Sequence, residues 1–86
     1  MLDEEFKRQI FTLSKIIDEL DYYQILKVDQ MAFEEDIKKA YFEESRLYHP
    51  DKFYTEPLEI QEKVTKIFKR ICEAYKVLSN PEKRAL

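Results

Sequence analysis

The sequence has no glycine, no tryptophan, a single cysteine and only three prolines. Because glycine adopts positive φ angles most readily, its absence disfavours β-hairpins and favours helices. The lone thiol, Cys72, excludes an internal disulfide and a zinc site built from several cysteines, and it fits a reducing compartment. There is no apolar run of about 18 residues, no signal-peptide pattern and no basic cluster. We therefore expect a soluble, cytoplasmic, all-α protein that binds neither membranes nor nucleic acid.

The residues that are present suffice for one small hydrophobic core. Of the 86 residues, 44% are hydrophobic and 38% are charged, and the net charge is −3. A chain of this length is expected to form one domain. Leu86 falls within a helical-looking stretch, so we expect the sequence to be a piece of a longer protein.

Apolar residues recur at helical spacing near the start of the chain. Steps of four, three, four and three residues separate Phe6, Ile10, Leu13, Ile17 and Leu20. This pattern predicts an amphipathic helix over residues 3–19. Its apolar face must be buried either on the rest of this chain or on other parts of the parent protein. A short helix is predicted over residues 22–26.

A longer helix is predicted over residues 34–48, with acidic residues in its first turn, where the helix dipole favours negative charge. Its expected buried positions are Ile37, Ala40, Tyr41, Leu47 and Tyr48. Pro50 must end this helix, because its ring pushes His49 out of the α region. A loop over residues 49–56 should follow.

The last long helix should begin at Pro57, which suits a first helical turn, and end near Leu78. Its expected apolar face consists of Ile60, Val64, Ile67, Phe68, Ile71, Tyr75 and Leu78. Asn80 and Pro81 should then cap and start a short final helix. Because a short loop joins the two long helices, they should pack antiparallel. Ile37, Tyr41 and Tyr48 should lie in their interface.

Four separated blocks, residues 21–26, 37–41, 48–52 and 71–85, carry a resemblance to a known family. In this order and spacing they make residues 21–86 resemble the J domain of the DnaJ co-chaperone family. Residues 1–20 would be an N-terminal helical extension. The resemblance implies an all-α J-domain fold, in which family helices II and III form an antiparallel hairpin. A His-Pro-Asp loop lies between them, and helices I and IV are short.

The resemblance implies an interaction module, not an enzyme, with no cofactor and no metal. J domains bind DnaK-class heat-shock chaperones and stimulate their ATP hydrolysis. The residues that match the family's essential loop are His49, Pro50 and Asp51, and those that match its basic docking surface are Lys38, Lys39, Arg46 and Lys52. Pro50 would fix the loop, Asp51 would offer a carboxylate to a partner arginine, and His49 would donate or accept hydrogen bonds. We expect a monomeric domain within a larger protein.

Helix II departs from the family pattern, because acidic residues outnumber basic ones between residues 34 and 48. The outward strip consists of Lys38, Phe42, Ser45 and Arg46. Phe42 stands where the family is usually basic, so it would either contact the partner or be covered by the N-terminal helix. Phe33 also occupies a position that often holds a capping residue, which predicts a weaker start for this helix.

Two further departures concern the turn after helix I, which must be made differently without its glycine, and the core. Lys27 replaces a usual glycine after helix I, and Glu44 replaces a usual leucine on the core-facing stripe. Because an unpaired buried carboxylate is costly, we expect Glu44 to be partly exposed. Its expected neighbour is one of three bases, Lys63, Arg70 or Lys15. Cys72, beside Ile71, is expected to be a small core residue.

Other interpretations of the sequence differ in class. The chain could be a degenerate J-like scaffold whose altered helix II binds a different partner. The iron–sulfur co-chaperone branch shares the look of residues 48–53, but it needs a C-terminal scaffold-binding domain absent from these residues. A hydrolase using His49 and Asp51 as an acid–base pair ranks last, because no Ser or Cys nucleophile lies nearby in sequence. A metal site at His49 lacks ligands at a recognisable spacing.

Overall fold

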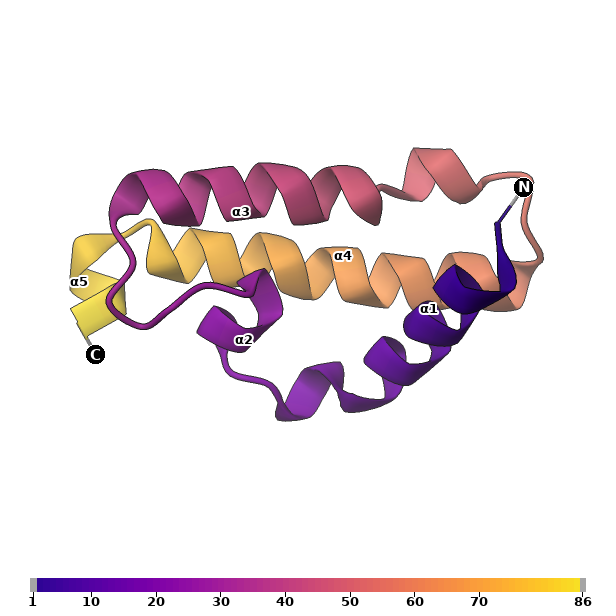
Figure 1. The fold of residues 1–86 in the computed structure, drawn as a ribbon, viewed down its shortest axis with the longest axis horizontal. Coiled ribbons are helices and arrows are strands. Elements are labelled where there is room, and N and C mark those ends of the chain that lie inside the picture. Colours follow the sequence, from indigo (N-terminus) through magenta and orange to yellow (C-terminus); the bar gives the residue numbers. More distant parts are fainter. Residues whose placement is uncertain (1, 86) are drawn as a thin grey trace.

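The computed structural model describes residues 2–85, and these contain helices and no strand (Figure 1). The elements in chain order are α1 (Glu4–Ile16), the 3-10 turn η1 (Ile17–Glu19), α2 (Tyr22–Leu26), α3 (Glu34–Leu47), the 3-10 turn η2 (Pro50–Phe53), α4 (Leu58–Leu78) and α5 (Pro81–Ala85). The all-α prediction is confirmed, and α3 and α4 form the expected antiparallel hairpin. Among these residues, no helix combines the length and the apolar character that crossing a membrane requires.

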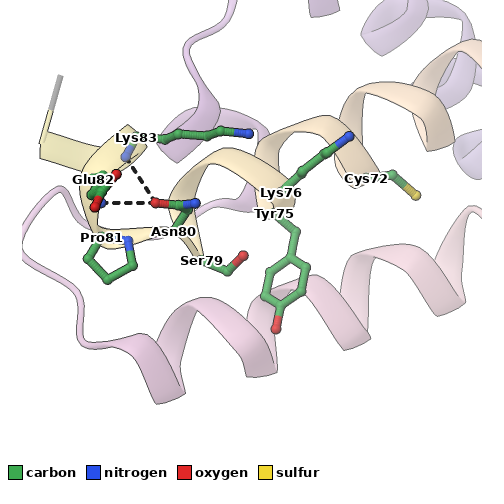
Figure 2. Close-up of a pocket in the computed structure, with 8 residues that line it drawn as sticks. All are labelled: Cys72, Tyr75, Lys76, Ser79, Asn80, Pro81, Glu82 and Lys83. Atoms are coloured by element: carbon green, nitrogen blue, oxygen red, sulfur yellow. Dashed lines mark hydrogen bonds between the residues drawn. The ribbon is translucent and has the colours of Figure 1, made fainter.

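Short polar side chains set the starts of three helices. Asp3 Oδ1 accepts a hydrogen bond of 2.7 Å from the Phe6 N–H at the start of α1. Asp21 and Gln24 form a reciprocal capping box at α2, with bonds of 2.8 and 2.9 Å. Asn80 Oδ1 accepts backbone hydrogen bonds from the first turn of α5, which confirms the predicted cap (Figure 2).

Helix α3 begins without a capping side chain, as the sequence predicts. Phe33 precedes the first helical residue and its ring has no acceptor, but Asp36 Oδ2 accepts the Phe33 N–H at 3.1 Å. The acidic first turn thus satisfies one backbone donor from inside the helix. At the other long helix, Pro57 lies one residue before α4 instead of in its first turn.

Helix α4 is the central element of the core. In Figure 1, α3 runs along one side of α4, and α1 and α2 are seen on the other. The large side chains with almost no exposure come from nearly all elements and are Ile10, Ile17, Leu26, Ile37, Tyr48, Phe53, Val64, Ile67 and Ile71. Burying an aliphatic or aromatic side chain of this size contributes roughly 1.5–3 kcal/mol. The apolar face of α1 is therefore buried on this chain itself, the first of the two expected alternatives.

Three side chains predicted for the core lie at its edge. Leu47 is 39% exposed. At about 100° per residue it lies about 80° from Ile37 around the helix, outside the stripe that faces α4. Phe68 is half-buried and its ring contacts His49, and Cys72 is also half-buried. Helical periodicity located the apolar faces, but their edges depend on how each helix is rotated against its neighbours.

Lys27, the departure in the turn, and Glu44, the departure in the core, form an ion pair with each other. Lys27 adopts the left-handed conformation (φ 60°, ψ 43°), and its Nζ lies 3.1 Å from Glu44 Oε1. Glu44 is buried, so the expected partial exposure and the three expected partners are wrong. Two of those bases have other neighbours: Lys63 lies over the Phe11 ring, and Arg70 contacts Asp18 and Glu73. The pairing arises because the turn after α2 brings Lys27 beside the end of α3.

We expect Lys27→Met to destabilise the chain by about 1–3 kcal/mol, because it leaves a buried carboxylate without its cation. The double variant Lys27→Gly with Glu44→Leu should recover this loss, since glycine adopts the left-handed conformation without strain and leucine suits a buried position. Urea unfolding of Lys27→Gly, of Glu44→Leu and of their double variant measures the coupling between the two positions. Lys7→Met is the matched control, because Lys7 pairs with Glu4 at the surface at 3.8 Å. Additive effects at positions 27 and 44 would contradict the assignment.

Candidate functional site

The predicted functional loop is an ordered turn between α3 and α4. Pro50 occupies the first position of η2, where its fixed φ and missing N–H are tolerated. The Lys52 N–H donates a 3.0 Å hydrogen bond to the His49 carbonyl, which closes the turn. Residues 50–53, predicted as irregular loop, are therefore a short 3-10 helix that displays His49 at its start.

The His49 imidazole has three contacts, and one of them is with the Asp51 carboxylate, whose Oδ2 lies 3.7 Å from Nδ1. Its Nδ1 accepts the Asp51 N–H at 3.2 Å, so in neutral imidazole the ring proton resides on Nε2. The Phe68 ring meets it edge-on, with centroids 5.1 Å apart. The side chain is still 46% exposed, and that of Asp51 is 92% exposed. The turn thus offers a partner one N–H donor and one carboxylate.

Both ends of the turn are anchored in the core. Tyr48, before His49, and Phe53, at the end of η2, are each 2% exposed. Burial raises the pKa of the Tyr48 hydroxyl, and the nearby Glu44 carboxylate raises it further. The phenol therefore stays neutral at physiological pH.

The predicted basic residues lie at the surface of α3 and η2. Lys38, Lys39, Arg46 and Lys52 are all exposed. Phe42 is 50% exposed, and the Lys38 ammonium lies 6.0 Å from its ring centre. The Tyr41 ring, also on α3, lies 5.7 Å from it between centroids, and half of the residue stays accessible from solvent. We call Lys38, Phe42 and Arg46 the α3 strip.

A broad groove of about 790 Å³ lies at the junction of α4 and α5 (Figure 2). It is lined by Cys72, Tyr75, Lys76, Ser79 and the start of α5, and neither His49 nor Asp51 lines it. Tyr75, one of the lining residues, stacks on Tyr41 with ring centroids 4.2 Å apart. Burial and the nearby Cys72 thiol raise the pKa of the Tyr41 hydroxyl. Within residues 2–85, no three His, Cys, Asp or Glu side chains gather as a metal site requires.

Another contact cluster connects α2 with α4. The Tyr22 hydroxyl donates a hydrogen bond to Glu73, and this bond, with the adjacent Arg70, lowers the pKa of the Glu73 carboxyl. The same bond and burial raise the pKa of Tyr22. This cluster connects α2 to α4, and Figure 1 shows α2 away from the turn that joins α3 and α4.

Comparison with known proteins identifies the family. The sequence model of the DnaJ domain matches residues 21–86. The chaperone protein DnaJ of Thermoplasma volcanium is 53% identical over 66 residues, which are 77% of this chain and 17% of that protein. That of Nitratiruptor sp. is 52% identical over 68 residues, 79% of this chain and 17% of the relative. The human DnaJ homolog subfamily C member 7 is 44% identical over 64 residues, 74% of this chain and 13% of that protein.

The chain therefore belongs to the DnaJ domain family. It spans less than a fifth of the length of these relatives. Helix α1 lies outside the matched residues. Sequence reasoning found the loop through its motif, but it missed Phe6 and Phe68 as neighbours of the loop, because periodicity assigns a residue to a face and does not say what that face touches.

Proposed function

We propose that this chain recruits a DnaK-class chaperone and stimulates its ATP hydrolysis through His49, Pro50 and Asp51. Its membership of the DnaJ family supports a co-chaperone role. The observation that carries the finer proposal is the exposed, ordered turn whose two ends are fixed in the core. No catalytic group of this chain is needed, because hydrolysis takes place in the partner.

The geometry suggests how the loop acts. The Asp51 carboxylate is suited to a bidentate bond with a partner arginine, and the His49 Nε2–H can donate to a partner acceptor. Pro50 and the closed turn hold both groups before binding, so little conformational entropy is lost when the partner docks. A rigid turn can in this way favour the hydrolysis-competent state of the chaperone by binding that state more tightly.

The direct test adds the purified chain to a DnaK-class chaperone and measures single-turnover ATP hydrolysis. We expect a faster rate that saturates with increasing chain concentration. An unchanged rate, with no binding detected by calorimetry, would refute the proposal for that chaperone.

A second candidate function is a J-like scaffold with another partner, and the α3 strip is the observation that favours it. Phe42 places an aromatic ring where the family is usually basic, and the exposed Glu43 opposes the field of Lys38 and Arg46. Charged surfaces mainly control association rate and its salt dependence. Docking on a generic DnaK should therefore be weaker and less salt-sensitive than that of a strongly basic J domain.

The double variant Phe42→Lys with Glu43→Arg should bind a generic DnaK about three- to tenfold more tightly at low salt. The gain should shrink as salt rises, because screening shortens the field to about 3 Å at 1 M. Met31→Lys with Glu82→Arg is the control, since it adds the same charge at the end of the molecule distant from the loop. If affinity at low salt does not rise, the altered strip does not limit docking, and the scaffold alternative is abandoned.

A further inference from the structure

Helix α1 contacts the chain on both sides of the His-Pro-Asp turn. The Phe6 ring centre lies 5.7 Å from that of Tyr48 and 6.1 Å from that of Phe53. Tyr48 immediately precedes His49, and Phe53 is the second residue after Asp51. One side chain from outside the DnaJ-matched residues thus packs against both anchors of the functional turn.

The lengths of the two hairpin helices explain why the turn has this neighbour. Helix α4 has 21 residues and α3 has 14. At about 1.5 Å per residue, α4 is longer than α3 by about 10 Å. The first turns of α4 therefore extend past the end of α3, and η2 and α1 pack on them.

Helix α1 is firmly docked, so it can support the turn. Ile10 of α1 is 0% exposed, and Ile17, the first residue of η1 directly after it, is 1% exposed. The Lys66 ammonium of α4 donates a 2.9 Å hydrogen bond to the Ser14 carbonyl and lies 3.3 Å from the Asp18 carboxylate. These contacts fix the position of α1 along α4 and its rotation about its own axis.

The position of Phe6 is also fixed locally. Its N–H is the one that the Asp3 cap binds, at 2.7 Å. A side-chain cap defines where a helix begins, and it restrains the first turn against fraying. The Phe6 ring is therefore held at the turn by backbone and helix contacts together.

The docked helix leaves the proposed binding surface open. All three residues of the α3 strip, as well as His49 and Asp51, remain exposed in the presence of α1. Helix α1 therefore supports the turn from its buried side and does not compete with a partner for it.

We propose that α1 is a brace for the His-Pro-Asp turn and that Phe6 is its positioning residue. Without the Phe6 ring, Tyr48 and Phe53 lose a shared contact and the turn samples more conformations. A turn that must be ordered during binding binds more weakly. The consequence for ATP hydrolysis rests on the proposed function, whereas the effect on the turn does not.

Amide hydrogen exchange tests the brace in the full chain without any chaperone. In Phe6→Ala we expect the amides of Asp51 and Lys52, which bond to His49, to exchange about tenfold faster, while amides in the middle of α4 change less. Phe11→Ala is the matched control, because that ring belongs to the same helix but lies under Lys63, 5.0 Å from its ammonium. If both variants accelerate amide exchange at the turn equally, Phe6 has a purely structural role and the proposal that α1 braces the turn is wrong.

The functional readout is the concentration of chain that half-stimulates a DnaK-class ATPase. It should rise about tenfold for Phe6→Ala and little for Phe11→Ala, and Phe6→Leu should recover part of the loss. If the native chain gives no stimulation, the proposed function fails, but hydrogen exchange still tests whether α1 braces the turn. If Phe6→Ala does not fold, Phe6→Leu takes its place, and uniform exchange across turn and core then counts against the proposal.

Discussion

Replacing His49 by Gln or Asp51 by Asn should reduce stimulation of a DnaK-class ATPase to the unstimulated rate and leave the domain folded. The Asp51 side chain is 92% exposed, so its replacement removes the proposed charge-assisted bond to the partner and no core contact. Glutamine at position 49 keeps hydrogen-bonding capacity but loses the ring that meets Phe68. Single-turnover hydrolysis measures the loss, and circular dichroism with thermal melting checks the fold.

The control for this prediction is Glu59→Gln. It removes a carboxylate of equal charge from an exposed position in the first turn of α4, outside the His-Pro-Asp turn. We expect this variant to stimulate nearly as well as the native chain, because an isolated surface charge contributes little. Full stimulation by both loop variants, or unfolding of either, would contradict the assigned role of the loop.

The helices could be predicted because local chemistry determines them. Pro50 and the Asn80-Pro81 pair end and begin helices through the missing N–H and the side-chain cap, and these effects need no tertiary contact. The apolar spacing of α1 and α4 likewise predicts which face of each helix is buried. The motif located the proposed functional turn for the same reason: its residues are contiguous in the sequence.

Contacts between elements could not be predicted in the same way. The Lys27–Glu44 pair joins residues 17 positions apart, and it depends on the left-handed conformation of Lys27 after α2. A lysine does not indicate this conformation as a glycine would. The contacts of Phe6 with Tyr48 and Phe53 depend on where α1 docks along α4. A hydrophobic pattern is satisfied by many dockings, and side-chain packing selects one of them.

The buried residues differ most from the predicted ones on α4. The sequence favours Phe68 as a central core residue, but Phe68 is half-buried against His49, whereas its neighbour Ile67 is 0% exposed. The two adjacent side chains therefore have different surroundings: Ile67 lies in the core, and Phe68 contacts the ring of His49, the proposed functional histidine. Substitutions at the two positions test this difference.

Ile67→Ala should destabilise the chain by about 2–5 kcal/mol, because it removes three buried carbon atoms and leaves a cavity in a close-packed core. At about 0.05–0.15 kcal/mol per residue, a domain of this size has a stability of about 4–13 kcal/mol, so the variant should lose a large part of it. Urea unfolding followed by circular dichroism measures the effect. Ile67→Val, which removes one carbon, should cost about 0.5–1.5 kcal/mol and serves as the graded control.

Phe68→Ala should cost less stability than Ile67→Ala but should reduce ATPase stimulation. The reverse order of stability would show that the buried face of α4 has been misassigned.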